Sequence, residues 1–322
     1  MASRARTSRL LPAACLCCLL AACALPGSAA HVPSAVPSAT SPTNPSARPV
    51  LRPLPDVLNG VTLDDVSALP QLVASLEALP QRPTERIVFD QGEPPSAYTA
   101  AVAALQPISY LMAEPVDSSQ VAGASLADYH ARTAALLAAF GTRIDLWEVG
   151  NEINGEWLGS AADVTAKVAD SYRQVAAAGG RTAITLYYNP NCSEDTAHQM
   201  LPWTRENVPQ DLKNGLDYVL VSYYEDNCHH YRPPLSEWNQ VFTELAQLFP
   251  HARVGFGENG TSERTAPLDQ KAEQLTHYYT LPVTAPRYMG GHFWWYYAED
   301  MLPYPPANAL WTALSRALTP LS

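Results

Sequence analysis

Short apolar runs and longer amphipathic stretches alternate along the chain from about residue 56 onward. The short runs are rich in β-branched and aromatic residues, which favours buried strands. The longer stretches are rich in alanine and leucine, and several end at glycine, as helices commonly do. The pattern predicts eight strands, at residues 59–63, 86–90, 108–113, 144–150, 183–188, 216–224, 253–257 and 291–297. It predicts eight helices between and after them, at residues 63–79, 95–105, 126–140, 161–178, 196–214, 235–249, 268–279 and 307–318.

Eight strand–helix units are the number that closes a parallel barrel. Such a barrel takes roughly 250 residues, so the 322 residues of the chain accommodate one barrel and an N-terminal leader. An open, doubly wound sheet is the alternative, but it would carry a glycine-rich phosphate-binding turn after an early strand, and none is found. The predicted fold is therefore α/β, with one (β/α)8 barrel, the TIM-barrel architecture, over residues 56–322.

The first 22 residues have the character of a targeting segment. They hold three arginines and no acid, followed by an apolar run that is too short to span a membrane as a mature helix. The run ends in Leu-Ala-Ala-Cys23, which resembles the bacterial lipoprotein signal, in which cleavage leaves the cysteine as a lipidated N-terminus. An ordinary secretory leader, cut near Ala29 and Ala30, is the alternative. Both predict export, and the first predicts a lipid anchor at Cys23 in the bacterial cell envelope, periplasmic or at the cell surface.

Residues 23–55 are rich in proline, serine, alanine and threonine and have no apolar periodicity, which predicts an extended tether. The net charge of the chain is −11, and without the leader 17 basic residues face 31 acidic ones, a balance of −14. A surface of this sign repels phosphate backbones, so nucleic acid is not an expected partner.

Cysteine usage agrees with export. Three of the six cysteines lie in the leader and a fourth is Cys23, which leaves Cys192 and Cys228 as an even pair in an oxidising compartment. We expect a disulfide between them, with two free thiols as the alternative. A metal site built from Cys228 and its neighbours Asp226, His229 and His230 is less favoured, because adjacent histidines cannot easily aim at one ion. No metal or cofactor is predicted.

Two predicted strands end in a carboxylate flanked by glycine. The fourth strand runs into Trp-Glu-Val-Gly-Asn-Glu152 and the seventh into Val-Gly-Phe-Gly-Glu258. In a barrel the chemistry lies at the carboxyl ends of the strands, and these two strands stand on opposing sides of the ring. Facing carboxyl groups suit glycoside hydrolysis, with retention at about 5 Å separation and inversion at about 6.5–9.5 Å. The alternative is that they are capping or salt-bridged acids at the starts of loops.

The order of these residues resembles the clan A glycoside hydrolases, across about residues 56–320. Those enzymes have Asn-Glu at the end of strand four, Glu at the end of strand seven and Trp at the end of strand eight. This chain has Asn151, Glu152, Glu258 and the pair Trp294-Trp295 in that order. The resemblance implies that Glu152 is the acid/base, that Glu258 is the nucleophile, and that Asn151 hydrogen-bonds the sugar 2-hydroxyl.

The resemblance also implies residues around the nucleophile. Arg86 matches a strand-two arginine that would keep Glu258 ionised, although it could instead be a surface residue at the start of a strand. A strand-six tyrosine would contact the nucleophile, and it is Tyr223 or Tyr224, with Tyr224 favoured.

Three further substrate-binding candidates are the tryptophan pair at the end of the eighth strand and Glu156, four residues past Glu152. Of the two tryptophans, Trp295 is favoured as the floor of the cleavage subsite, and Trp294 could be core packing. Glu156 could bind substrate or cap the next helix. Other acids could line subsites, although most are expected to be solvated or capping: Asp90, Glu93, Glu114, Asp117, Glu148, Glu225, Asp226, Glu299 and Asp300.

The sequence therefore predicts an exported, monomeric, retaining glycosidase. Its expected partners are a membrane, through Cys23, and an oligosaccharide or polysaccharide substrate with O-glycosidic, β-type linkages. A non-catalytic glycan-binding lipoprotein and a transglycosylase on the same barrel are the alternatives. An esterase is disfavoured because the chain has no G-x-S-x-G nucleophile elbow.

Overall fold

The computed structural model describes residues 51–304 and 308–319 of the chain. Eight parallel strands pair in sequence order and close on themselves, so the predicted α/β barrel of the (β/α)8 type is confirmed. The strands are β1 (Leu58–Leu63), β2 (Thr84–Val88), β3 (Tyr110–Glu114), β4 (Leu146–Gly150), β5 (Thr182–Tyr187), β6 (Tyr218–Tyr223), β7 (Arg253–Asn259) and β8 (Gly290–Trp294).

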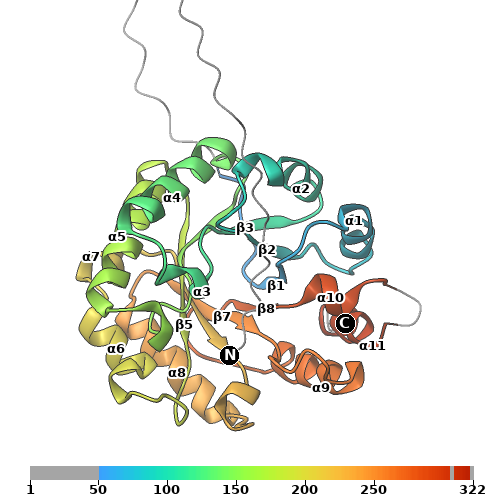
Figure 1. The fold of residues 1–322 in the computed structure, drawn as a ribbon. Coiled ribbons are helices and arrows are strands. Elements are labelled where there is room, and N and C mark those ends of the chain that lie inside the picture. The colour runs from blue at the N-terminus through green and yellow to red at the C-terminus, as the bar shows by residue number, and fades with distance from the viewer. Residues whose placement is uncertain (1–50, 305–307, 320–322) are drawn as a thin grey trace, which may run out of the picture. The chain divides into compact units, whose positions relative to one another are not determined.

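Helices surround the strands in a ring that follows the chain order (Figure 1). They are α1 (Leu69–Glu77), α2 (Thr99–Leu105), α3 (Ser118–Val121), α4 (Leu126–Phe140), α5 (Ala161–Ala177), α6 (Met200–Asn207), α7 (Gln210–Gly215), α8 (Leu235–Leu248), α9 (Leu268–Tyr279), α10 (Tyr297–Met301) and α11 (Ala309–Ala317). Short 3-10 helices add η1 (Pro95–Tyr98), η2 (Glu156–Leu158), η3 (Thr196–His198) and η4 (Asp226–Cys228).

The structure corrects several predicted boundaries. The helix expected at 63–79 begins only at Leu69, because Asp65 accepts the backbone N–H of Ser67 in a turn and a proline fits best in the first helical turn. The helix expected at 196–214 is divided into η3, α6 and α7, since Pro209 cannot continue α6. Tyr297, expected at the end of the eighth strand, instead begins α10.

The backbone of β8 is irregular, so the alternation of its side chains cannot be predicted from the sequence. Gly290 and Gly291 have φ values of 74° and 97°, and His292 and Phe293 follow with positive φ. A Cβ on Gly291 would lie 1.9 Å from the backbone oxygen of Phe256, so only glycine allows β8 to approach β7 there.

The inside of the barrel is filled in two layers. An apolar cluster separate from the main core fills the lower layer, formed by Leu58, Met112, Leu146, Ala183, Tyr218, Leu220, Met289 and Phe293. Alternate residues of a strand share a face, so the residues two places further along four of these strands point into the same space. They are polar: Glu114, Glu148, Thr185 and Ser222. The apolar layer therefore supports a buried polar layer toward the carboxyl ends of the strands.

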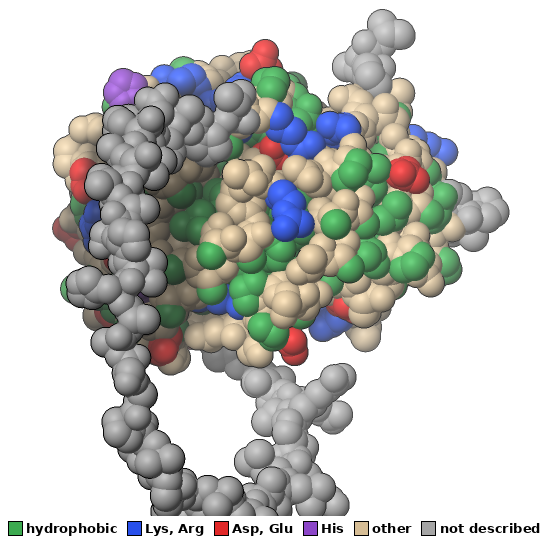
Figure 2. Space-filling view, turned by 90° about the horizontal axis from the view of Figure 1, so that it is seen from above, with side chains coloured by type: hydrophobic (Ala, Val, Ile, Leu, Met, Phe, Trp, Pro, Cys, Tyr) green, Lys and Arg blue, Asp and Glu red, His purple; other side chains and the backbone are tan. Residues whose placement is uncertain are grey.

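On the face seen in Figure 2, apolar, acidic and basic side chains are intermixed. No helix among residues 51–304 and 308–319 is long and apolar enough to cross a membrane. The predicted leader at 1–22, the lipidation at Cys23 and most of the tether at 23–55 lie outside the described residues.

One buried acid lies between the barrel and the helices. Glu85 of β2 is fully buried, and it accepts a hydrogen bond from the Ser109 hydroxyl. Burial raises the pKa of Glu85 to about 8. At neutral pH its carboxyl group is therefore protonated in the folded protein and ionised in the unfolded chain, which lowers stability as the pH rises from about 4.5 toward 8.

We predict that Glu85→Gln stabilises the protein, with a gain that is absent near pH 4 and grows to roughly 4 kcal/mol at pH 7.5. Thermal melting as a function of pH measures this gain. Glu77→Gln, at an exposed position of α1, is the matched control and should follow the wild type. A Glu85→Gln melting curve that shows the same difference from wild type at every pH would contradict the shifted pKa.

Candidate active site

The side chain of Arg86 lies at the centre of the polar layer. It is fully buried in the middle of β2, so the alternative of a surface position is wrong. Its Nε and Nη2 donate to Glu148 at 2.7 and 3.1 Å, and its Nη1 donates to Glu258 at 2.5 Å. Glu114 lies 3.1 Å from Nη2. One guanidinium therefore joins carboxyl groups from β3, β4 and β7.

Glu258 is held near the end of β7 by two strong donors. Its Oε2 accepts from Arg86, and its Oε1 accepts from the Tyr224 hydroxyl at 2.5 Å. Burial raises the pKa of Glu258, while the Arg86 charge and the Tyr224 hydroxyl act to lower it. The pKa of Glu258 is raised overall, and one of its two donors, the Arg86 guanidinium, is a cation that favours the ionised carboxylate.

Glu152 lies just past β4 in a different environment. Its Oε1 accepts from the Ser222 hydroxyl at 2.6 Å and its Oε2 from the Ser118 hydroxyl at 2.8 Å, and no cation contacts it among the described residues. Burial raises the pKa of Glu152 to about 8, and the charge of Glu258 adds to the rise. Glu152 also has a φ of 47°, a sparsely populated conformation that clusters at functional sites.

The two acids face one space. Ser222, which donates to Glu152, is the direct neighbour of Glu258 in the β6–β7 ladder. Neighbouring strands lie about 4.8 Å apart, so the carboxyl group of Glu152 reaches the position beside Glu258. A carboxyl group whose pKa is raised to about 8 therefore faces one that is paired with a cation. Such a pair can donate a proton on one side of a bond and attack or activate water on the other.

Asn151 is oriented by the same short segment that holds Glu152. Its Oδ1 accepts the backbone N–H of Ser118 at 2.9 Å, and its Nδ2 lies 3.5 Å from Glu148 Oε1. The side-chain amide is thereby fixed in the polar layer beside the two acids, with only 1% of the residue exposed.

The structure separates the paired aromatic candidates. Trp295 is partly exposed, and the Arg86 guanidinium lies 5.1 Å from its ring centroid. Trp294, a substrate-binding candidate from the sequence, is fully buried and donates its indole N–H to Asp300. Tyr223 is likewise fully buried and packs among aromatic rings on the helix side, whereas its neighbour Tyr224 reaches Glu258. Trp294 and Tyr223 are therefore corrected to core residues.

The loops around the site are tied to one another. The predicted disulfide is confirmed, with Cys192 and Cys228 joined at 2.08 Å between the loops after β5 and β6. This removes Cys228 as a metal ligand. Glu156 does not reach the polar layer through any described contact; its carboxylate accepts the backbone N–H of Asp195 at 2.9 Å and so ties the loop after β4 to the loop after β5.

Several residues of the site were not selected from sequence. The sequence places Glu114 and Glu148 only among acids expected to be mostly solvated or capping, although their two-residue spacing from Met112 and Leu146 predicts positions inside the barrel. Ser222 has the same two-residue spacing from Leu220 of the apolar layer. Ser118 lies at the start of α3, and no signal in the sequence marks it.

An aromatic pair lies on the β4–β5 side of the mouth. Trp157, in η2, is 38% exposed, and its ring packs edge-on against Tyr187 at 5.3 Å between centroids. Tyr187 lies at the end of β5. Burial raises its pKa, and the charge of Glu152 adds more to that rise than any other charge. This pair is placed beside the acid at 152, opposite the β8 side where Trp295 lies.

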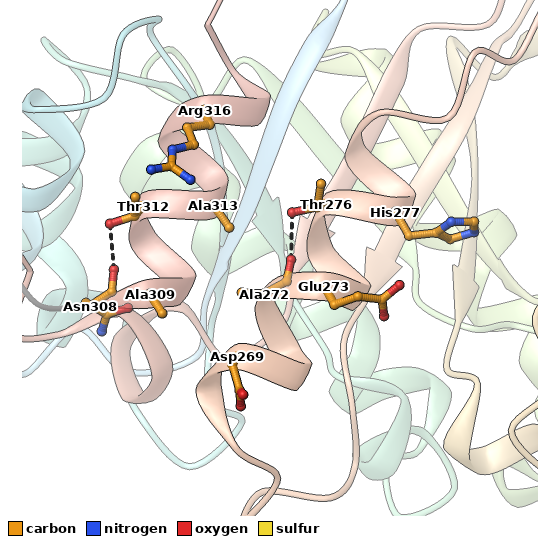
Figure 3. A pocket seen from close by; sticks show the side chains of 10 residues that line it. All are labelled: Asp269, Ala272, Glu273, Thr276, His277, Asn308, Ala309, Thr312, Ala313 and Arg316. Carbon is orange, nitrogen blue, oxygen red and sulfur yellow. Dashed lines mark hydrogen bonds between the residues drawn. The ribbon is translucent and has the colours of Figure 1, made fainter.

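A groove of about 680 Å³ lies elsewhere, on the outside of the barrel between α9 and α11. Figure 3 shows the small side chains Ala272, Ala309 and Ala313 between the two helices, which explains the gap, with Asp269 and Arg316 near its ends. None of the polar-layer residues lines it, so it is not part of the candidate active site.

Comparison with known proteins gives the fold but no sequence family. No protein-family model matches the chain, and no curated protein matches it in sequence. A thermostable mutant of a xylanase from Cellvibrio japonicus is 15% identical with a TM-score of 0.54, over 83% of this chain and 99% of that one. A glycoside hydrolase family 5 enzyme from Prevotella bryantii, a mutant in complex with a xyloglucan tetradecasaccharide, is 14% identical with a TM-score of 0.52, over 82% and 94%.

A third similar structure is a glucosidase from Croceicoccus marinus, 13% identical with a TM-score of 0.53, over 81% of this chain and 67% of that one. At these identities the likeness concerns the barrel fold that the chain shares with these glycoside hydrolases.

We predict that the carboxyl group of Glu152 titrates near pH 8 and that Glu258→Gln lowers its pKa, because the variant removes the neighbouring negative charge. Carbon-13 NMR of glutamate-labelled protein measures this titration, with Glu152→Gln identifying the resonance. Ser222→Ala should move the pKa in the opposite direction, since it removes a hydrogen bond that favours the ionised form. A Glu152 resonance that titrates near pH 4.5 in every variant would refute the environment described.

Proposed function

We propose that the protein is a retaining glycoside hydrolase that cleaves O-glycosidic bonds. The observation that carries this proposal is the pair of buried carboxyl groups from β4 and β7, which face one space and of which only Glu258 is paired with a cation. Glycoside hydrolysis needs one carboxylic acid to protonate the leaving oxygen and one carboxylate on the other side of the bond. The fold shared with a xylanase and a glucosidase supports the same class.

In the proposed first step, Glu152 donates its proton to the glycosidic oxygen while the Glu258 carboxylate attacks the anomeric carbon. The carbon–oxygen bond to the leaving group breaks and a covalent glycosyl-enzyme ester forms. In the second step, Glu152 accepts a proton from water as the water oxygen attacks the same carbon, and Glu258 leaves as a carboxylate. Arg86 and Tyr224 stabilise that carboxylate at both of its oxygens.

The short path between the acids supports retention. Ser222 links the Glu152 carboxyl group to the strand position directly beside Glu258, and the charge of Glu258 acts on Glu152, which favours the short separation of about 5 Å that retaining enzymes use. An inverting enzyme needs a wider gap to hold a water molecule between carboxylate and sugar.

The proposed substrate is an oligosaccharide or polysaccharide. Trp295 on the β8 side and the Trp157–Tyr187 pair on the β4–β5 side offer partly exposed aromatic rings, which stack on the apolar faces of sugar rings. Asn151, fixed by Ser118, is the residue proposed to hydrogen-bond the sugar 2-hydroxyl. We propose a β-linked glycan of the cell envelope or its surroundings, because a lipid anchor at Cys23 and a tether over residues 23–55 would hold the barrel at a membrane surface.

We predict that Glu258→Gln abolishes turnover by at least about 10⁴-fold while the variant keeps the wild-type melting temperature to within a few degrees, because an amide cannot form the glycosyl ester. A screen of β-linked polysaccharides and oligosaccharides, read by reducing ends, gives the rates. Labelling by a 2-deoxy-2-fluoro glycoside followed by peptide mass spectrometry should place the sugar on Glu258. Glu77→Gln, on the outside of α1, is the control and should be as active as the wild type.

Two outcomes separate the rival functions. A wild type that binds glycans without cleaving any of them would favour a glycan-binding protein and overturn the proposal. Products longer than the substrate at high acceptor concentration, in place of hydrolysis products, would identify a transglycosylase that uses the same two carboxyl groups.

We predict that Tyr224→Phe moves the acid limb of the pH profile of kcat/KM to higher pH. The Tyr224 hydroxyl lowers the pKa of Glu258 by hydrogen-bonding its ionised form, so its loss raises that pKa. The alkaline limb, set by Glu152, should stay near pH 8 in both proteins. Tyr188→Phe is the matched control, since that hydroxyl donates to Glu237 on α8. A Tyr224→Phe acid limb that coincides with wild type would show that the hydroxyl does not act on Glu258.

A further inference from the structure

The polar layer contains more carboxyl groups than one arginine can neutralise. Three of them, from Glu114, Glu148 and Glu258, lie within 3.1 Å of the Arg86 guanidinium, and all four side chains are buried. Among the described residues no second cation pairs with these three acids. Burying two uncompensated negative charges would be very costly, so at least one of the acids is expected to hold a proton.

The hydrogen bonds of each acid indicate which one is neutral. Glu148 accepts Nε and Nη2 of Arg86 and the hydroxyl of Thr185, and Glu258 accepts Nη1 of Arg86 and the hydroxyl of Tyr224. In both cases one of the donors is the Arg86 guanidinium, and a hydrogen bond from a cation favours the ionised carboxylate. Neither oxygen of Glu114 has a hydrogen-bond partner, although both are buried.

We propose that Glu114 is a positioning residue that holds a proton in the native protein and, being neutral, leaves the charge of Arg86 to Glu148 and Glu258. An ionised Glu114 would draw the same guanidinium toward β3. It would also add a third negative charge to those of Glu148 and Glu258. The neutral form removes both effects. The catalytic consequence rests on the proposed glycosidase function, whereas the protonation state stands on the contacts alone.

The surroundings of Glu114 agree with a neutral side chain. The charged and titratable groups that face it are Arg86 on β2, Glu148 on β4, Glu258 on β7, Asp117 before α3 and Tyr129 on α4. Four of these five groups are acidic or neutral. Burial raises the pKa of Glu114 well above its usual range, the Arg86 charge opposes the rise, and the neighbouring carboxylates add to it.

The nearby hydroxyl on α4 does not satisfy Glu114. The side chain of Tyr129 donates its hydroxyl to the backbone oxygen of Val149 at 3.0 Å. A protonated Glu114 therefore stands beside Arg86 without competing for it.

Infrared difference spectroscopy tests the protonation state without any substrate. Spectra of the wild type minus Glu114→Gln, recorded in the resting protein at pH 7, should show the loss of one carboxylic-acid C=O stretch and no loss of carboxylate bands. Glu85→Gln is the positive control, because it removes another buried, protonated acid that does not contact Arg86. Glu148→Gln is the negative control and should remove carboxylate bands. Loss of carboxylate bands in Glu114→Gln overturns the proposal.

A second variant keeps the test usable if Glu114→Gln does not fold properly. If Glu114→Gln melts far below the wild type, Glu114→Met replaces it, because methionine has a similar length and needs no hydrogen-bond partner. It should remove the same acid band.

The acid limb of the pH profile of kcat/KM tests whether Glu114 leaves the pKa of Glu258 unchanged. When a neutral side chain replaces a neutral one, the field at Glu258 does not change, so the limb of Glu114→Gln should coincide with that of the wild type. If Glu114 were ionised, its removal would lower the pKa of Glu258 and move the limb down by about one pH unit or more, which would overturn the proposal. Loss of the acid band in a protein that cleaves no glycan would support the neutral Glu114 and count against the glycosidase function only.

Discussion

The burial of the Arg86 guanidinium is the constraint on which the site depends. A charge with no exposure to water is tolerated only when it is paired and hydrogen-bonded, and here its partners come from three other elements of the barrel. Closure of the eight strands brings those partners together, since β2 neighbours β3 but not β4 or β7. The same contacts that stabilise the buried arginine therefore fix Glu258 and Glu148 in place.

The glutamates at 152 and 258 would have the same pKa in water, but in the folded protein their neighbours differ. Glu258 is met by a cation and a phenol, both of which favour its ionised form, whereas Glu152 is met by two serine hydroxyls and by the charge of Glu258. Environments that push two carboxyl groups toward different protonation states are the basis of acid–base assignments in enzymes. The proposed roles of the two acids follow from that difference in neighbours.

The polar layer is supported from below and tied at its rim. The apolar layer that contains Met112, Leu146 and Leu220 keeps water out of the barrel below the polar layer, which strengthens the charge interactions in the polar layer. At the rim, the bridge between Cys192 and Cys228 joins the loops after β5 and β6, and Asp226 accepts the backbone N–H of Ser262 at 2.6 Å, joining the loops after β6 and β7. The walls around Glu152 and Glu258 are thus connected to one another as well as to their strands.

The sequence by itself determined the number and order of the strands, the cysteine pair, and the positions of Glu152 and Glu258 at strand ends, because hydrophobic periodicity and glycine-flanked acids are local signals. Only the tertiary structure decided which member of each aromatic pair reaches the site. A shift of one residue moves a side chain to the other face of a strand, and the positive φ values at Gly290 and Gly291 break the alternation before Trp294 and Trp295. The gathering of Glu114, Glu148 and Ser118 around the two acids was likewise decided in three dimensions, since it depends on barrel closure and on burial, which no segment of the chain carries alone.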